Sequence, residues 1–148
     1  SKAAGAEGMV AGQSRDLLYT GENAGERELL AIYRDKTGRL IAAPLVMAAC
    51  IAGKCRGEAE AFGLALGDLF QLTDDILDAV GESGKLGKSV GKDEAEHKLT
   101  AVRVFTLDGA WARADACAGR CRMQLAAMDG ADTAFLEEFV GYVLNRDR

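Results

Sequence analysis

The chain has almost no proline and no pattern of the kind that builds sheets. Among its 148 residues there is one proline, and no run of four to eight residues alternates cleanly between apolar and polar side chains. A period of two is the mark of a half-buried strand, so its absence argues against a β-rich fold. The sequence therefore predicts an all-α protein.

Histidine and paired cysteines, the usual ligands of zinc, are also scarce. The cysteines are Cys50, Cys55, Cys117 and Cys121, no two of them form a Cys-x-x-Cys pair, and the single histidine, His97, is remote in sequence. A structural zinc site needs such ligands at short, regular spacings, so zinc is not expected. We expect small thiols, buried or half-buried, in a reducing compartment.

The chain lacks a basic surplus and a membrane-length apolar run. The net charge is −5, whereas nucleic acids and anionic membranes attract broad basic surfaces. Residues 40–53 are the longest apolar candidate, but a span needs about 20 apolar residues. Residues 1–10 have neither the basic start nor the apolar core of a signal peptide. We expect a cytoplasmic protein with no nucleic-acid partner and no stable membrane insertion.

Helical periodicity is present over most of the chain. We expect helices at residues 26–34, 37–52, 58–80, 99–128 and 134–144, with a further helix before them that ends near Gly12 and Gln13. Residues 37–52 are nearly all apolar, so that helix is expected to be buried. No repeat, low-complexity tract or linker divides residues 1–148, which we treat as one segment.

The most informative feature is an acidic stripe on the helix at residues 58–80. At about 3.6 residues per turn, Gln71, Asp74, Asp75 and Asp78 fall on one face. Crowded like charges destabilise a helix unless a cation lies between them. Oxygen ligands of this kind suit Mg²⁺, which takes one or two carboxylates and bridges to substrate phosphates. A solvated helix face is the plain alternative, but strongly apolar neighbours favour a metal-diphosphate site.

The segment after the stripe supplies positive charge and glycine. Residues 81–93 include Gly87-Lys88, which suits close backbone approach to phosphate and a point charge beside it. A P-loop is excluded, because its first glycine would fall at Glu82 and the segment follows a helix rather than a strand. A solvated loop remains the alternative reading.

Read in order, four motifs closely resemble the trans-prenyltransferase family of isoprenyl diphosphate synthases, in particular bacterial farnesyl and geranylgeranyl diphosphate synthases. They are Gly12-Gln13-x-x-Asp16, Lys36-Thr37-Gly38, Phe70-Gln71-x-x-Asp74-Asp75-x-x-Asp78 and Gly87-Lys88-x-x-Gly91-Lys92-Asp93 with Lys98. The resemblance runs over essentially the whole chain. It implies the helical bundle of the isoprenoid synthases around a deep central cavity, of which this chain would form the C-terminal half.

The resemblance also implies a reaction. Mg²⁺, for which Mn²⁺ could substitute, and lysine would withdraw charge from an allylic diphosphate, so that an allylic cation forms. Isopentenyl diphosphate would attack this cation through its double bond, and loss of a proton would complete a short-chain prenyl diphosphate. Charge stabilisation in a water-poor site carries such a reaction without a covalent enzyme intermediate.

Roles carry over residue by residue from the same resemblance. Asp74, Asp75 and Asp78 match the second aspartate-rich motif and would hold the metal. Lys36 would bind the allylic diphosphate, Thr37 would lie along the path of the cation, and Gln13 and Gln71 would orient polar groups. Lys88 and Lys98 would bind diphosphate, and Arg146 and Arg148 would help to close the site.

The first aspartate-rich motif of the family is not found in this sequence. We therefore expect a missing N-terminal half to be a partner of this segment, which alone should be inactive, and the family resemblance implies a homodimer. A noncatalytic partner subunit, or an inactive fragment of a synthase, is the alternative. Product chain length cannot be read from this sequence, because the residues that set it in the family precede that first motif.

Overall fold

The computed structural model describes residues 1–22, 24–83 and 98–146, and all regular structure in these ranges is helical. This confirms the predicted all-α class. In chain order the helices are α1 (Met9–Leu18), α2 (Glu26–Tyr33), the π-helical turn η1 (Arg34–Gly38), α3 (Arg39–Ala52), α4 (Arg56–Ser83), α6 (Ala101–Ala126) and α7 (Ala134–Asn145).

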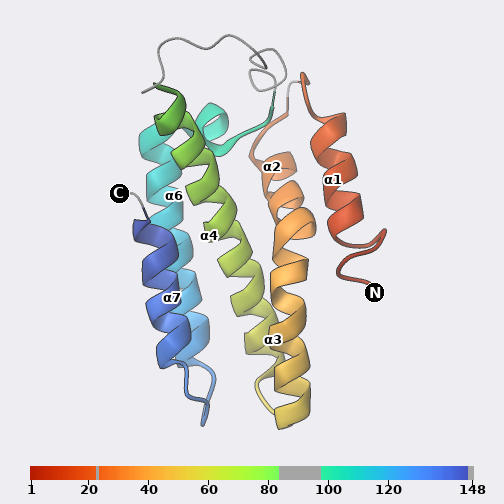
Figure 1. Cartoon of the computed structure of the whole chain (residues 1–148), viewed down its shortest axis with the longest axis vertical. Coiled ribbons are helices and arrows are strands. Elements are labelled where there is room, and N and C mark those ends of the chain that lie inside the picture. The colour runs from red at the N-terminus through yellow and green to blue at the C-terminus, as the bar shows by residue number, and fades with distance from the viewer. Residues whose placement is uncertain (23, 84–97, 147–148) are drawn as a thin grey trace.

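Helix α4 is the centre of the molecule. It packs against α6 and α7 on one side and against η1 and α3 on the other, with α1 outermost beyond η1 (Figure 1). Its apolar side chains Phe62, Leu69, Leu72 and Ile76 are almost completely removed from water. Each contributes roughly 2 kcal/mol of burial free energy, so this stripe anchors the flanking helices to α4.

The segment from α2 to α3 is one continuous helix with a π-helical turn in it. Sequence reasoning expected two separate helices, the second starting near Thr37, and this boundary is wrong. No proline or αL residue interrupts residues 34–38, so the backbone widens instead of ending. Gly67 of α4 lies directly beneath the turn, where a Cβ would come 2.4 Å from the Cα of Gly38. Single π-helical turns inside α-helices occur frequently at functional sites.

Helix α3 is not the buried helix that its composition predicts. Its buried residues are Ala42 and Ala49, whereas Leu40, Met47 and Ile51 are 44%, 65% and 88% exposed. The reason is geometric: only the side of α3 that carries small residues meets α4, where a Cβ on Gly63 would lie 2.4 Å from the Cα of Ala42. An apolar composition does not show whether a neighbour covers the whole surface of a helix.

Three of the four cysteines match the expectation of buried or half-buried thiols. Cys117 and Cys121 are buried on α6, Cys55 is half-buried, and all four thiols are free; Cys50 is exposed, so the expectation is wrong for it. Burial raises the pKa of Cys117 to about 11 and that of Cys121 to about 12. These two thiols stay protonated at neutral pH and behave as small apolar side chains.

Two further observations complete the fold. Thr106 interrupts α6 with a φ of 66°, a left-handed value that non-glycine residues seldom adopt, so the expected helix at residues 99–128 is divided near its start. In the described ranges no helix is both long and apolar enough to span a membrane.

Candidate functional site

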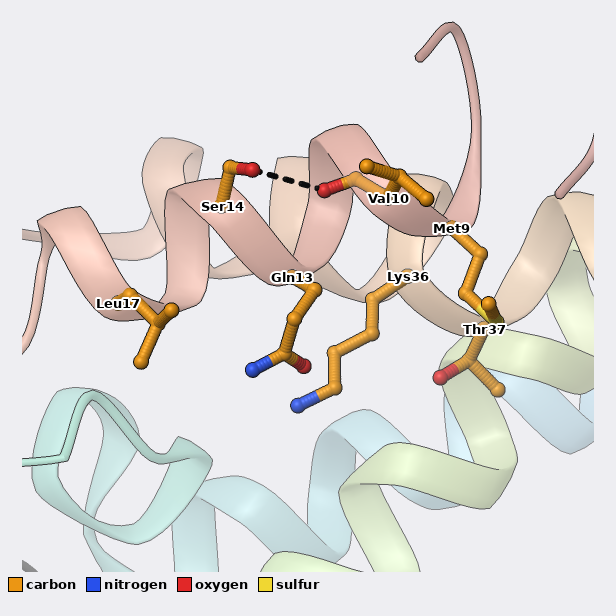
Figure 2. Close-up of a pocket in the computed structure, with 7 residues that line it drawn as sticks. All are labelled: Met9, Val10, Gln13, Ser14, Leu17, Lys36 and Thr37. Carbon is orange, nitrogen blue, oxygen red and sulfur yellow. Dashed lines mark hydrogen bonds between the residues drawn. The ribbon is translucent and has the colours of Figure 1, made fainter. Parts of the chain in front are cut away.

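A pocket of about 360 Å³ lies between α1 and η1, and it gathers three residues that the sequence singled out. Gln13 comes from α1, and Lys36 and Thr37 come from η1 (Figure 2). The complete lining is Met9, Val10, Gln13, Ser14, Leu17, Lys36 and Thr37. The pocket therefore combines apolar walls with an amide, an ammonium and two hydroxyl groups.

Gly12 brings the two walls of the pocket together. A Cβ at Gly12 would lie 2.1 Å from the backbone nitrogen of Lys36, a distance that packed side chains do not reach. The absence of a side chain lets α1 rest on the backbone of η1. Gln13 and Lys36 then extend side by side in the same direction (Figure 2).

Substitution of Gly12 tests this close contact. We expect Gly12→Ala to push α1 away from η1, to separate Gln13 from Lys36, and to lower the free energy of unfolding by about 1–3 kcal/mol. Urea denaturation measures this loss. The matched control is Gly119→Ala on α6, where nothing lies within 4 Å of the added Cβ. Equal stabilities in the two variants would show that Gly12 is not in close contact with η1.

Asp35 fixes the orientation of the π-helical turn. Its carboxylate is 3% exposed and forms ion pairs with Arg15, Arg39 at 2.8 Å and Arg34 at 3.4 Å. A buried carboxylate is costly unless it is paired, and three guanidinium groups offset that cost here. Because Asp35 is held inside, the next residue, Lys36, projects into the pocket.

The ammonium of Lys36 already has an anionic partner. Its Nζ lies 2.6 Å from Oδ2 of Asp16, which is buried on α1. A lysine ammonium has three donors, so one ion pair leaves capacity for a second anion. The arrangement holds a positive charge in the pocket in a defined position.

Asp74 and Gln71 form a second polar group on the surface of α4. The side-chain nitrogen of Gln71 donates to Oδ2 of Asp74 at 3.3 Å, and the guanidinium of Arg146 donates to Oδ1. The side chain of Asp74 is 37% exposed, and Asp78, one turn later, is exposed. Two carboxylates therefore face solvent from one side of α4.

Asp75 departs from the expected single acidic stripe. Its Oδ2 accepts hydrogen bonds from the hydroxyl of Tyr33 and from the backbone N–H of Ala101 at 2.6 Å, and the residue is buried. Burial raises the pKa of the Asp75 carboxyl, and the partial compensation from Tyr33, Ala101 and the charge of Lys98 is smaller. Within the described ranges, no three His, Cys, Asp or Glu side chains form a ready metal site. Asp75 instead joins α4 to α2 and to the start of α6.

The two remaining lysines are less well placed. Lys88 lies outside the described residues. Lys98 is exposed just before α6, and its backbone carbonyl accepts a hydrogen bond from Arg103 at 3.0 Å. Its binding role remains a prediction.

The sequence model of the family described as Polyprenyl synthetase matches residues 3–127, which is most of the chain. The chain belongs to the polyprenyl synthetase family. The farnesyl diphosphate synthase of Geobacillus stearothermophilus is 37% identical over 145 residues, covering 95% of this chain and 49% of that protein. Geranylgeranyl pyrophosphate synthase 4 of Arabidopsis thaliana is 33% identical, covering 99% of this chain and 41% of its own length.

A solved structure supports the same assignment of the fold. The geranyltransferase of Helicobacter pylori, complexed with magnesium and isoprenyl diphosphate, superposes with a TM-score of 0.76 at 28% identity. The superposition covers 98% of this chain and 48% of that one. The chain therefore has the isoprenyl diphosphate synthase fold, and it spans about half the length of the relatives it matches.

Several residues of this polyprenyl synthetase site were not assigned a role from the sequence. Asp16 pairs with Lys36 and Asp35 pairs with Arg15, in each case 20 residues away along the chain. Tyr33 pairs with Asp75, which is 42 residues away, and Asp35 also pairs with Arg39 on its other side. A charged residue within an Arg-Asp-Lys run looks like ordinary surface. Only Asp16 carried a signal, as the last residue of the Gly12-Gln13-x-x-Asp16 motif.

Proposed function

We propose that this polyprenyl synthetase chain provides the allylic-diphosphate and metal-binding portion of a prenyltransferase. The enzyme would join an allylic diphosphate to isopentenyl diphosphate and form a short-chain product such as farnesyl or geranylgeranyl diphosphate. The observation that carries the proposal is the pocket in which Gln13, Lys36 and Thr37 converge. By the family resemblance, Lys36 would bind the allylic diphosphate, Thr37 would lie along the path of the cation, and Gln13 would orient polar groups.

The donor groups on α4 suit Mg²⁺. The carboxylate of Asp78 is exposed, and that of Asp74, one helical turn earlier, is partly exposed with a hydrogen bond on each oxygen. Mg²⁺ uses one or two carboxylates together with substrate phosphates. Mg²⁺, when bound, neutralises the diphosphate so that the allylic C–O bond can break. Asp75 supports this site indirectly, because its hydrogen bonds fix the position of α4 relative to α2 and α6.

The chain's own residues would then bind and orient the substrate. Lys36, positioned by Asp16, places an ammonium against the diphosphate, and the amide of Gln13 provides a further donor beside it. Thr37 presents its hydroxyl toward the pocket beside Met9, and Leu17 lines the opposite end (Figure 2). Met9, Val10 and Leu17 are exposed in this chain. The pocket would therefore keep water away from a cationic hydrocarbon chain, and strengthen the fixed charges around it, only once the rest of the enzyme covers it.

Transfer would need more than the residues present here. We propose that a segment corresponding to the remaining half of the relatives, on the same or on a second polypeptide, supplies the first aspartate-rich motif, and that two copies of the completed synthase associate as a dimer. A noncatalytic subunit is less favoured, because it would have no physical need for a paired lysine in an apolar pocket or for exposed carboxylates on α4.

The proposal is tested by binding rather than turnover, since the chain alone is expected to be inactive. We expect geranyl diphosphate to bind the 148-residue chain about tenfold more tightly with Mg²⁺ than with EDTA, a coupling of ordinary size between two ligands. Titration calorimetry measures both affinities. Geraniol, which lacks the diphosphate, is the control and should bind in neither condition. Metal-independent binding, or equal binding of geraniol, would refute the proposal.

A further inference from the structure

The guanidinium of Arg146 is packed against α4 at the acidic surface. It donates to Oδ1 of Asp74, to Oγ1 of Thr73 at 2.9 Å and to the carbonyl of Phe70 at 3.3 Å, and it lies 4.5 Å from the centre of the Phe70 ring. The Arg146 side chain is 19% exposed. One cation is therefore already bound where the proposed metal ligand lies.

The position of Arg146 in the chain gives this contact a mechanical consequence. Arg146 follows the last turn of α7 with an extended backbone, φ −60° and ψ 122°, and reaches across to a residue 72 positions earlier. Among the described residues its Nε is the buried side-chain atom without a hydrogen-bond partner. While Arg146 is bound to Asp74, its Nε–H donor has no acceptor, and release of Arg146 from Asp74 would return that donor to water.

We propose that Arg146 is an internal counter-cation of Asp74, which Mg²⁺ displaces when it binds, so that metal binding frees the end of α7. The inference rests on the proposed function, because it takes Asp74 as a metal ligand. Both oxygens of Asp74 are engaged, one by Arg146 and the other by Gln71. A metal ion needs direct approach to a carboxylate oxygen, at about 2.0–2.1 Å for Mg²⁺, and it repels a guanidinium held on the same atom.

A purely structural clamp makes a different prediction. If Arg146 only fastened α7 to α4, its loss would loosen the helix and leave metal affinity unchanged or weaker. If it competes with the metal, its loss raises the fraction of chains with a free Asp74, and the apparent affinity rises in proportion.

The first readout is Mn²⁺ affinity, measured on the full chain by electron paramagnetic resonance of the free ion. We expect Arg146→Met to bind Mn²⁺ about tenfold more tightly than the wild type. The matched control is Arg113→Met, which removes an arginine with the same kinds of contact: an ion pair to Glu26 at 2.5 Å and the ring of Phe105 at 4.5 Å. Arg113→Met should leave the affinity unchanged.

Removal of a positive charge could tighten metal binding without any displacement, so a second variant and a second readout are needed. Arg146→Lys keeps the charge but loses the planar fork and much of the ring contact, and it should also bind Mn²⁺ more tightly. Amide hydrogen exchange reports release directly: saturating Mn²⁺ should increase exchange at residues 141–146 in the wild type and have no such effect in Arg146→Met.

Each failure has its own signature. Wild-type affinity in both Arg146 variants, or unchanged exchange at residues 141–146 on metal binding, would overturn the inference while the metal site stands. If Asp74→Asn binds Mn²⁺ as well as the wild type, Asp74 is not a metal ligand. The proposed metal site then fails, and the inference fails with it.

Discussion

Asp74→Ala is expected to weaken Mg²⁺-dependent binding of geranyl diphosphate by about 100-fold. Loss of a group that merely supports a metal ligand costs about 10–100-fold in affinity, so loss of a direct ligand should lie at the upper end. The carboxylate of Asp74 is partly exposed beside Gln71, one turn before Asp78, so a bridging metal could reach it by displacing Arg146. Titration calorimetry with and without Mg²⁺ measures the effect.

Three control variants test whether the loss of binding is specific to Asp74 or follows from the loss of any negative charge or of any other side chain. Asp108→Ala removes the same charge from an exposed position on α6, and Cys117→Ala and Cys121→Ala alter buried thiols in the same helix. All three should retain metal-dependent binding within about twofold, because Asp108 is not one of the proposed metal ligands and the two buried thiols are uncharged at neutral pH. Similar losses in Asp74→Ala and Asp108→Ala would show that net charge, and not metal coordination, controls binding.

Asp75→Ala is expected to lower the free energy of unfolding by about 3 kcal/mol, because a buried donor left without an acceptor costs about 1–3 kcal/mol. Two such donors would be left, the hydroxyl of Tyr33 and the N–H of Ala101. Asp75→Asn keeps an oxygen that can accept both hydrogen bonds, so it should cost much less. Urea denaturation at neutral pH compares the variants. Equal losses in the two variants would show that the hydrogen bonds do not stabilise the fold.

The pH dependence of the stability difference between Asp75→Asn and the wild type gives an independent check on the role of Asp75. Burial raises the pKa of Asp75 above its ordinary value of 3.8, so the folded state binds the proton more tightly than the unfolded state. The contribution of Asp75 to stability is then full at low pH and falls as pH rises through the folded pKa. Asparagine does not titrate, so the stability of Asp75→Asn relative to the wild type should increase as pH rises. A constant difference would contradict the raised pKa.

The helical fold was predictable because its signals are local. The long apolar stripe of α4, the turn at residues 53–57 and the starts of α6 and α7 are visible as periodicity and turn residues. The errors occurred where neighbours decide the outcome. The joined α2, η1 and α3 helices follow the direct contact of Gly38 with Gly67 of α4, and no local sequence signal reports a contact across that distance.

The candidate site was predicted in part. Gln13 was chosen from one motif and the adjacent Lys36 and Thr37 from another, and the structure brings the two motifs together in one pocket. The predicted stripe of three aspartates was divided: Asp74 and Asp78 face solvent, whereas Asp75 points to Tyr33 and Ala101. Adjacent residues on a helix differ by about 100° in direction, which spacing alone shows, but the identity of the neighbour on each side is a tertiary fact.

The sequence by itself determined the helical class, the order of the four motifs and hence the polyprenyl synthetase family, since these depend on residue types and short spacings. The tertiary structure alone decided that Asp16 holds Lys36, that Asp75 holds Tyr33, and that Arg146 occupies Asp74. These pairs are separated by 20, 42 and 72 residues, and their polar groups meet only after the helices have packed. Packing of apolar faces sets which helices are neighbours, and polar partners follow from that arrangement.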